Sequence, residues 1–264
     1  MDPLSGTTRL ALAVPQAKSL LGSQKFEGDS VGGRSLVHWE AGAVCEDEAW
    51  EAAYERFETP EEEIRKFLRR YRRIGIDALP RSSRVVELFC GRGNGLVALE
   101  RMGFRSLEGV DLSSGLAERY RGPAQLYVGD CRQLRFEADS KDLVVIQGGL
   151  HHLPSLPDDV ERVFGEINRI LRPDGRVAIV EPWLTPFLRV VHTAYASRVL
   201  RRLWPKLDAL ASMNEREEVT YQGWLVQPRL IRRLLVESFV PERRLERFGK
   251  LLFLGRPRKG EAAE

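Results

Sequence analysis

Short apolar runs recur between residues 84 and 182, and polar or glycine residues follow each of them. Runs that are apolar at nearly every position are typical of parallel strands, because helices cover both faces of a parallel sheet. Segments with helical spacing or turn residues separate the runs, so the chain is predicted to form a mostly parallel α/β sheet with helices on both faces. The predicted strands are Val85–Leu88, Ser106–Asp111, Ala124–Cys131, Asp142–Gln147 and Arg176–Pro182.

The spacing of apolar residues also predicts the connecting helices. A short helix covers Leu96–Met102, and a longer amphipathic helix covers Val160–Leu171 before the turn Arg172–Gly175. Upstream of the strands, another helix is expected to begin after Thr59. The sequence there supplies an N-cap threonine, a proline in the first turn and the glutamate of a capping box.

A glycine-rich pattern marks the end of the first predicted strand. Glu87 is followed by glycines at alternate positions, Gly91, Gly93 and Gly95, where the strand should turn into a helix. Glycine lets the backbone turn sharply and lets a ligand lie against it. A dinucleotide-binding fingerprint has its third glycine three residues after the second, and that position is Leu96. The spacing therefore disfavours a nicotinamide-dependent oxidoreductase.

An acid followed by G-x-G-x-G resembles motif I of the class I S-adenosylmethionine (SAM) methyltransferases, and the resemblance covers roughly residues 84 to 182. The Leu-His-His-Leu-Pro and Leu-Arg-Pro-Asp-Gly-Arg segments are similar to the methyltransferase type 11 branch, which includes ubiquinone and menaquinone methyltransferases. The resemblance implies a Rossmann-like, seven-stranded sheet with an antiparallel last strand. The segments Arg244–Phe248 and Lys250–Leu254 would form the closing hairpin.

The same resemblance implies that SAM is the cofactor and which residues bind it. Glu87 and the glycine backbone would hold the amino-acid end, Asp111 the ribose hydroxyls and Asp130 the adenine amine. Charge-assisted hydrogen bonds of this kind are stronger than neutral ones. The full implied set is Glu87, Gly91, Gly93, Gly95, Asp111, Leu112, Asp130, Cys131, Gln147 and Gly148. Each acid alone could equally be a helix cap at the end of a strand.

Several residues are candidates for contact with a methyl acceptor. His151 and His152 follow the fourth strand, where the family places the acceptor pocket, and histidine titrates near neutrality. Either could act as a general base, and the alternative is a packing role at the start of the next helix. Weaker candidates for substrate contact are Tyr54, Glu181, His192 and Tyr195.

The organisation outside the sheet is less regular. We expect a loosely ordered arm over residues 1–40, a helical lid over 41–80 and the methyltransferase domain over 81–264. Within that domain, residues 183–225 are too long for an ordinary connection and form a predicted helical insertion on the substrate side. One helix from Leu188 to Trp204 is expected there. Its arginines are compatible with lid packing, with an anionic or lipid-like acceptor, or with membrane contact.

Composition narrows the class of protein. The hydrophobic fraction of 43% is ordinary for a globular protein, and a net charge of +3 does not favour nucleic acid as a partner. The cysteines, Cys45, Cys90 and Cys131, are widely spaced, so neither a disulfide framework nor a metal site is predicted. No apolar run is long enough to span a membrane, and no secretory signal precedes the domain, so a cytoplasmic location is expected.

The sequence therefore predicts an enzyme that transfers a methyl group from SAM to an O, N or C atom of a small-molecule acceptor and releases S-adenosylhomocysteine. Two alternatives stay open at this point. One is a macromolecular methyltransferase acting on protein or RNA, and the other is a non-catalytic SAM-fold binding protein. The acceptor and the oligomeric state are not predicted.

Overall fold

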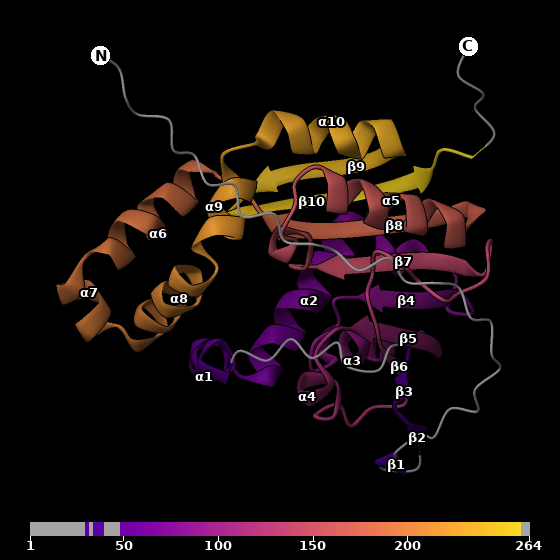
Figure 1. Ribbon diagram of the computed structural model, residues 1–264, viewed down its shortest axis with the longest axis horizontal. Helices are drawn as coiled ribbons and strands as arrows, with labels where there is room; N and C mark the ends of the chain where they lie inside the picture. Colours follow the sequence, from indigo (N-terminus) through magenta and orange to yellow (C-terminus); the bar gives the residue numbers. More distant parts are fainter. Residues whose placement is uncertain (1–29, 32–33, 40–47, 260–264) are drawn as a thin grey trace, which may run out of the picture.

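A twisted sheet with helices on both faces forms the centre of the computed structural model, which describes residues 30–31, 34–39 and 48–259 (Figure 1). The sheet has eight strands in the order β3-β6-β5-β4-β7-β8-β10-β9. Its strands are β3 (Val37–His38), β4 (Arg84–Leu88), β5 (Ser106–Asp111), β6 (Gln125–Val128), β7 (Lys141–Gln147), β8 (Leu171–Pro182), β9 (Phe239–Arg247) and β10 (Lys250–Pro257). The short strands β1 (Ser30–Val31) and β2 (Arg34–Ser35) pair only with each other.

Adjacent residues of one strand pack under helices on opposite faces of the sheet, as the pleat requires. Val86 and Leu88 of β4 pack in the core that includes α5 and α10, whereas Val85 packs in the core that includes α2 and α3. The helices are α1 (Glu48–Phe57), α2 (Pro60–Ile74), α3 (Asn94–Arg101), α4 (Ser114–Ala117), α5 (Asp158–Ile170), α6 (Pro186–Ala196), α7 (Arg198–Leu203), α8 (Pro205–Arg216), α9 (Glu218–Leu225) and α10 (Pro228–Ser238).

The predicted α/β fold is confirmed, including its closing hairpin. Strands β4, β5, β6, β7 and β8 run parallel, and β10 is antiparallel to both β8 and β9. The start of α2 is also confirmed, because Thr59 and Glu62 form both hydrogen bonds of a capping box. The predicted turn Arg172–Gly175 lies inside β8, where the pairing with β7 shifts register.

The structure adds an eighth strand to the predicted seven. β3 pairs in parallel with β6 at one edge of the sheet. Next to β3, Trp39 is buried against Tyr127 and Phe136, with ring centroids 5.0 and 5.2 Å away. The end of the predicted N-terminal arm is thus part of the sheet. The rest of that arm, except residues 30–31 and 34–36, and Cys45 lie outside the described residues.

The insertion after β8 consists of α6, α7, α8 and α9, and the prediction of a single helix from Leu188 to Trp204 is wrong. The helix breaks at Ser197, whose hydroxyl accepts a hydrogen bond from the Leu200 backbone and starts α7. A serine that caps a helix in this way competes with continuation of the preceding one. The end of the insertion returns to its beginning, because the Trp224 indole donates to the Pro182 carbonyl at 2.9 Å.

Figure 1 shows α6, α7 and α8 projecting beyond one end of the sheet. α8 packs mainly against α1, so the insertion and the N-terminal helices lie together at this end. Among the helices that the structure describes, none combines the length and the apolar character needed to cross a membrane.

Candidate active site

The glycine loop after β4 reverses the chain through backbone conformations that side chains rarely adopt. Phe89, Gly91 and Gly93 have φ angles of 57°, 50° and 76°. Left-handed φ is unfavourable for a bulky residue such as Phe89 and persists only when its surroundings impose it. Gly149 provides the space here, because a Cβ on Gly149 would lie 2.1 Å from the Phe89 ring. The loops after β4 and β7 are therefore fitted to each other.

Glu87 lies buried beneath the start of α3, and its carboxylate occupies the space that a side chain at position 95 would need. A Cβ on Gly95 would lie 1.8 Å from Glu87 Oε1. The Tyr71 hydroxyl donates to that oxygen at 3.4 Å, whereas Glu87 Oε2 has no hydrogen-bond partner. Burial, and then the nearby charge of Glu63, raise the pKa of Glu87. A buried carboxyl with an unused oxygen fits a ligand that brings its own ammonium group.

This packing leads to a stability prediction. In Gly95→Ala, the new methyl group collides with a buried carboxylate, so we expect the free energy of unfolding to fall by about 1–3 kcal/mol. Gly165 on α5 is the matched control, because a Cβ there meets nothing within 4 Å. Gly165→Ala should raise the free energy of unfolding by about 0.5–1 kcal/mol. Urea titrations measure both, and equal stability of Gly95→Ala and the wild type would contradict the packing described.

Asp111 ties the end of β5 to the glycine loop. Its Oδ2 accepts from the Gly91 amide at 2.7 Å, and its Oδ1 accepts from the Ser113 amide at 2.8 Å. Burial raises the pKa of Asp111, and these two amides oppose the shift. A carboxylate offers about four lone-pair sites, so acceptor capacity remains for ligand hydroxyls. Leu112 follows and is partly buried.

The residues predicted to meet adenine and the sulfonium have different surroundings. The Asp130 carboxylate is bound by Arg132 at 2.6 Å, and Arg132 also reaches Asp159 at 3.0 Å. Burial alone would raise the pKa of Asp130, but the hydrogen bonds from Arg132 hold it below its usual value. Cys131 is buried. Gln147 at the end of β7 has a buried side-chain nitrogen without a partner, and Gly148 follows it at a φ of 77°.

The two histidines after β7 differ in burial and in partners. They lie in the short 3-10 turn η2 (Leu150–His152), with ring centroids 4.1 Å apart. The buried His151 contacts Glu181 Oε2 through Nδ1 at 2.7 Å. The other carboxylate oxygen of Glu181 accepts from the amides of Gly149 and Leu150, both at 2.9 Å. Glu181 is fully buried at the end of β8 and fixes both the turn and the imidazole.

Glu217, which sequence reasoning missed, completes this group from the junction of α8 and α9. It lies 3.2 Å from His152 Nδ1 and 3.8 Å from His151 Nε2. Burial, and then the charge of His152, lower the pKa of His151 despite its bond to Glu181. Burial also acts against the charged form of His152, but the hydrogen bond to Glu217 outweighs it and raises that pKa. The surroundings therefore favour the neutral form of His151 and the protonated form of His152.

The insertion brings its aromatic residues to the same place. His192 on α6 contacts the Tyr221 hydroxyl of α9 at 3.2 Å through Nε2, and Tyr221 packs edge-on against His151 at 5.8 Å. Tyr195 lies 5.0 Å from His192, ring to ring. The structure thus gathers His151, His152, Glu181, His192 and Tyr195 at one site, together with Glu217 and Tyr221.

Tyr54 belongs to the other side of the site. Its hydroxyl donates to Glu63, and its ring lies under the Arg92 guanidinium at 4.3 Å. Glu63 also accepts from Asn94 at 2.6 Å, so α1 and α2 are bonded to the glycine loop. Tyr54 is therefore placed with the predicted cofactor loop rather than with the histidines. Its predicted contact with the substrate stays a prediction.

One set of atoms at this site has spacing that a metal ion accepts. A nitrogen of His151, a nitrogen of His152 and an oxygen of Glu217 lie within 4.8 Å of one another. His152 Nδ1 already contacts Glu217 at 3.2 Å, so these two groups have partners without a metal. The sequence pattern gave no metal prediction because Glu217 is distant along the chain.

Comparison with known proteins identifies methyltransferases as relatives. A family model described as a methyltransferase domain matches residues 86–179. A demethylmenaquinone methyltransferase of Streptomyces avermitilis is 29% identical over 169 residues, which are 60% of this chain and 68% of that protein. A protein of Mycobacterium ulcerans, named as a phthiotriol/phenolphthiotriol dimycocerosates methyltransferase, is 32% identical over 130 residues, 47% of this chain and 49% of that one.

A solved structure shares the fold. The PH0226 protein of Pyrococcus horikoshii superposes with a TM-score of 0.59 and 18% identity, over 81% of this chain and all of that one. Most of the curated relatives are matched over only about 40–50% of their length.

The sheet order, the glycine loop that follows a buried acid, and these matches define the class of protein. The chain is a class I SAM-dependent methyltransferase. Its cofactor is SAM. Within that class, it is similar to the methyltransferases named for demethylmenaquinone.

Proposed function

We propose that this enzyme methylates a small-molecule acceptor at an atom that must lose a proton, a hydroxyl oxygen or an activated carbon, and releases S-adenosylhomocysteine. This choice narrows the O, N or C acceptor expected from the sequence. The observation that carries it is the buried contact between Glu181 and His151 Nδ1. An amine acceptor can react through its own lone pair, whereas a hydroxyl or a carbon acid needs a base.

The residues at the ends of β4, β5 and β7 offer hydrogen-bond acceptors that match the donor groups of SAM. We assign the ammonium group to the unpartnered oxygen of Glu87 and the ribose hydroxyls to Asp111. Gly91, Gly93 and Gly95 would let the amino-acid end lie against the backbone. Asp130 already shares its carboxylate with Arg132, so its bond to adenine would use the remaining lone pairs.

Bound SAM supplies a methyl group on a positively charged sulfur. The chain's own work is to align the acceptor and to take up its proton. The Glu181 carboxylate requires a hydrogen on Nδ1 of His151, and the neutral ring then keeps its lone pair on Nε2. That nitrogen would accept the proton of the acceptor as the acceptor atom attacks the methyl carbon. The imidazolium formed is stabilised by Glu181 and Glu217.

Three observations support the class of acceptor. Tyr221, His192 and Tyr195 place aromatic rings from the insertion around the base. His152 is close enough for its charge to act on the pKa of Asp111, so the proposed base and the proposed ribose site are neighbours. The similar proteins are named for demethylmenaquinone and for phthiotriol dimycocerosates. We therefore propose a ring-bearing or lipid-like acceptor with a hydroxyl or an acidic carbon.

An assay of S-adenosylhomocysteine formation tests this proposal. We expect turnover with members of a panel of phenols and hydroquinones, no turnover with matched amines, and the same rates in the presence of a chelator. Loss of activity on chelation would shift the role of His151, His152 and Glu217 from proton transfer to metal binding. Turnover restricted to amines would contradict the base mechanism. SAM binding without turnover of any phenol, hydroquinone or amine would contradict the proposed class of acceptor.

A further inference from the structure

The short helix α7 carries a hydrophobic face that no part of the described structure covers. Val199, Leu203 and Trp204 keep 68%, 75% and 62% of their surface exposed, and Leu200 is exposed as well. Leu203 is three residues after Leu200 and four after Val199, so it shares a side of the helix with both, and Trp204 follows directly as the C-cap residue. Exposed clusters of large apolar residues usually mark a contact surface.

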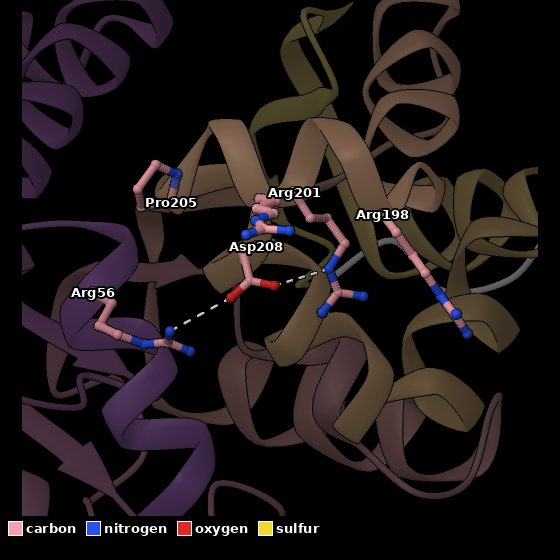
Figure 2. A pocket seen from close by; sticks show the side chains of 6 residues that line it. Arg56, Arg198, Arg201, Pro205 and Asp208 are labelled. Carbon is pink, nitrogen blue, oxygen red and sulfur yellow. Dashed lines mark hydrogen bonds and ion pairs between the residues drawn. The ribbon is translucent and has the colours of Figure 1, made fainter.

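Arginines line a cavity next to this face. The cavity has a volume of about 590 Å³ and lies between α1, α7 and α8 (Figure 2). Asp208 is its one acidic lining residue, and it binds Arg201 at 2.9 Å and Arg56 at 3.5 Å. The lining residues are Arg56, Arg198, Arg201, Arg202, Pro205 and Asp208.

Two of these arginines are available for an external anion. Neither Arg198 nor Arg202 has an acidic partner among the residues that the structure describes, and both are exposed. The chain from residue 184 to 207 contains no aspartate or glutamate. Among the basic residues of this stretch, Arg201 contacts Asp208 and Glu215, and Lys206 contacts Glu62, so Arg198 and Arg202 add positive charge that these described ion pairs do not balance.

We propose that α7 and the arginine-lined cavity form a docking surface for a membrane of anionic phospholipids. Leu203, Trp204 and their neighbours would enter the interfacial region, while Arg198 and Arg202 would bind lipid phosphates. This combination of a cationic face and an apolar face with tryptophan is what holds interfacial helices in the plane of a bilayer. A protein partner would match the apolar face, but the uncompensated arginines favour a surface that is itself anionic.

The position of α7 connects this surface with the candidate acceptor site. α7 follows directly after α6, which carries His192 at the candidate acceptor site. Docking through α7 would hold that site next to a bilayer, where an apolar acceptor is concentrated. This benefit rests on the proposed function, whereas the docking itself requires neither SAM nor an acceptor.

Vesicle sedimentation of the full chain tests the docking alone. We expect binding to phosphatidylcholine vesicles that contain phosphatidylglycerol, little binding to phosphatidylcholine alone, and weaker binding at high salt. In Arg198→Glu/Arg202→Glu, the partition coefficient should fall at least about twentyfold. In Leu203→Ser/Trp204→Ser, it should fall about tenfold or more, because the apolar contact is lost.

The controls keep net charge and fold comparable. Arg105→Glu/Arg135→Glu makes the same charge change at two exposed arginines elsewhere on the chain and should bind like the wild type. Equal loss in this control would reduce the effect to net charge and overturn the proposal. Binding of glycerol 3-phosphate to the chain, without any vesicle binding, would assign the cavity to a soluble phosphate instead. A dimer that Leu203→Ser/Trp204→Ser disrupts, again without vesicle binding, would assign the face to a second copy of the chain.

Discussion

SAM binding is expected to weaken by at least about a hundredfold when Asp111 is replaced by alanine. The proposed bonds to two ribose hydroxyls are charge-assisted, and each contributes about 1.5–3 kcal/mol. The substitution also removes the acceptor of the Gly91 and Ser113 amides, so the glycine loop loses the bond that holds it to β5. Both effects act on the same ligand.

Calorimetric titration with SAM measures this change. Asp174→Ala is the matched control, because Asp174 is exposed in the β8 segment that contains the predicted turn. Within the described residues, its backbone carbonyl accepts a hydrogen bond from Arg176, whereas its side chain makes none. Circular dichroism of both variants establishes that they are folded. Unchanged SAM affinity in a folded Asp111→Ala protein would remove Asp111 from the cofactor site.

The second large effect is expected from Glu181→Gln. The glutamine oxygen can still accept from the Gly149 and Leu150 amides, but its NH2 group would face His151 Nδ1 as a donor. The imidazole would then accept through Nδ1 and carry its hydrogen on Nε2, the wrong tautomer for a base. We expect kcat to fall by about 10²–10⁴, with SAM affinity nearly unchanged.

A pH profile distinguishes this role from a merely structural one. The base must be neutral, and the pKa of His151 lies below its usual value, so the wild-type rate should stay constant near pH 7 and fall only as the pH drops through that lowered pKa. Glu181→Gln should lose this acidic limb as well as its rate. Glu161→Gln, at an exposed position on α5, is the control. A Glu181→Gln enzyme with wild-type kcat would contradict the proposed base.

The sequence could predict which residues gather in the proposed cofactor half of the site because their signals are local. The signals lie within a few residues of one another at the carboxyl end of the buried strand β4: Glu87, Gly91, Gly93 and Gly95. The sequence did not show, however, why position 95 must be a glycine. Its backbone is not left-handed, and the glycine is required by the carboxylate of Glu87 packed against it.

The acceptor half could be predicted only in part. His151 lies in the turn that follows β7, and Glu181 lies at the end of β8; the parallel sheet places these two strands side by side. Glu217 and Tyr221 come from the insertion, whose path depends on the break at Ser197 and on contacts between helices distant along the chain. Helical periodicity reports which side of a helix is apolar, but not where the helix lies. Nor does it report whether the apolar side is covered: Val199 and Leu203 share one side of α7, and both are exposed.

The bond between Trp224 and the Pro182 carbonyl bears on how this enzyme can diversify. This hydrogen bond brings the two ends of the insertion together, so residues 183–224 leave the sheet and return to it at the same place. A change within these residues can leave the positions of β8 and α10 unaltered, because both ends of the insertion are held together. The glycine loop and Asp111, which we propose to bind SAM, lie outside this segment. Under this proposal, changes in residues 183–224 would alter the acceptor and leave the use of SAM unchanged.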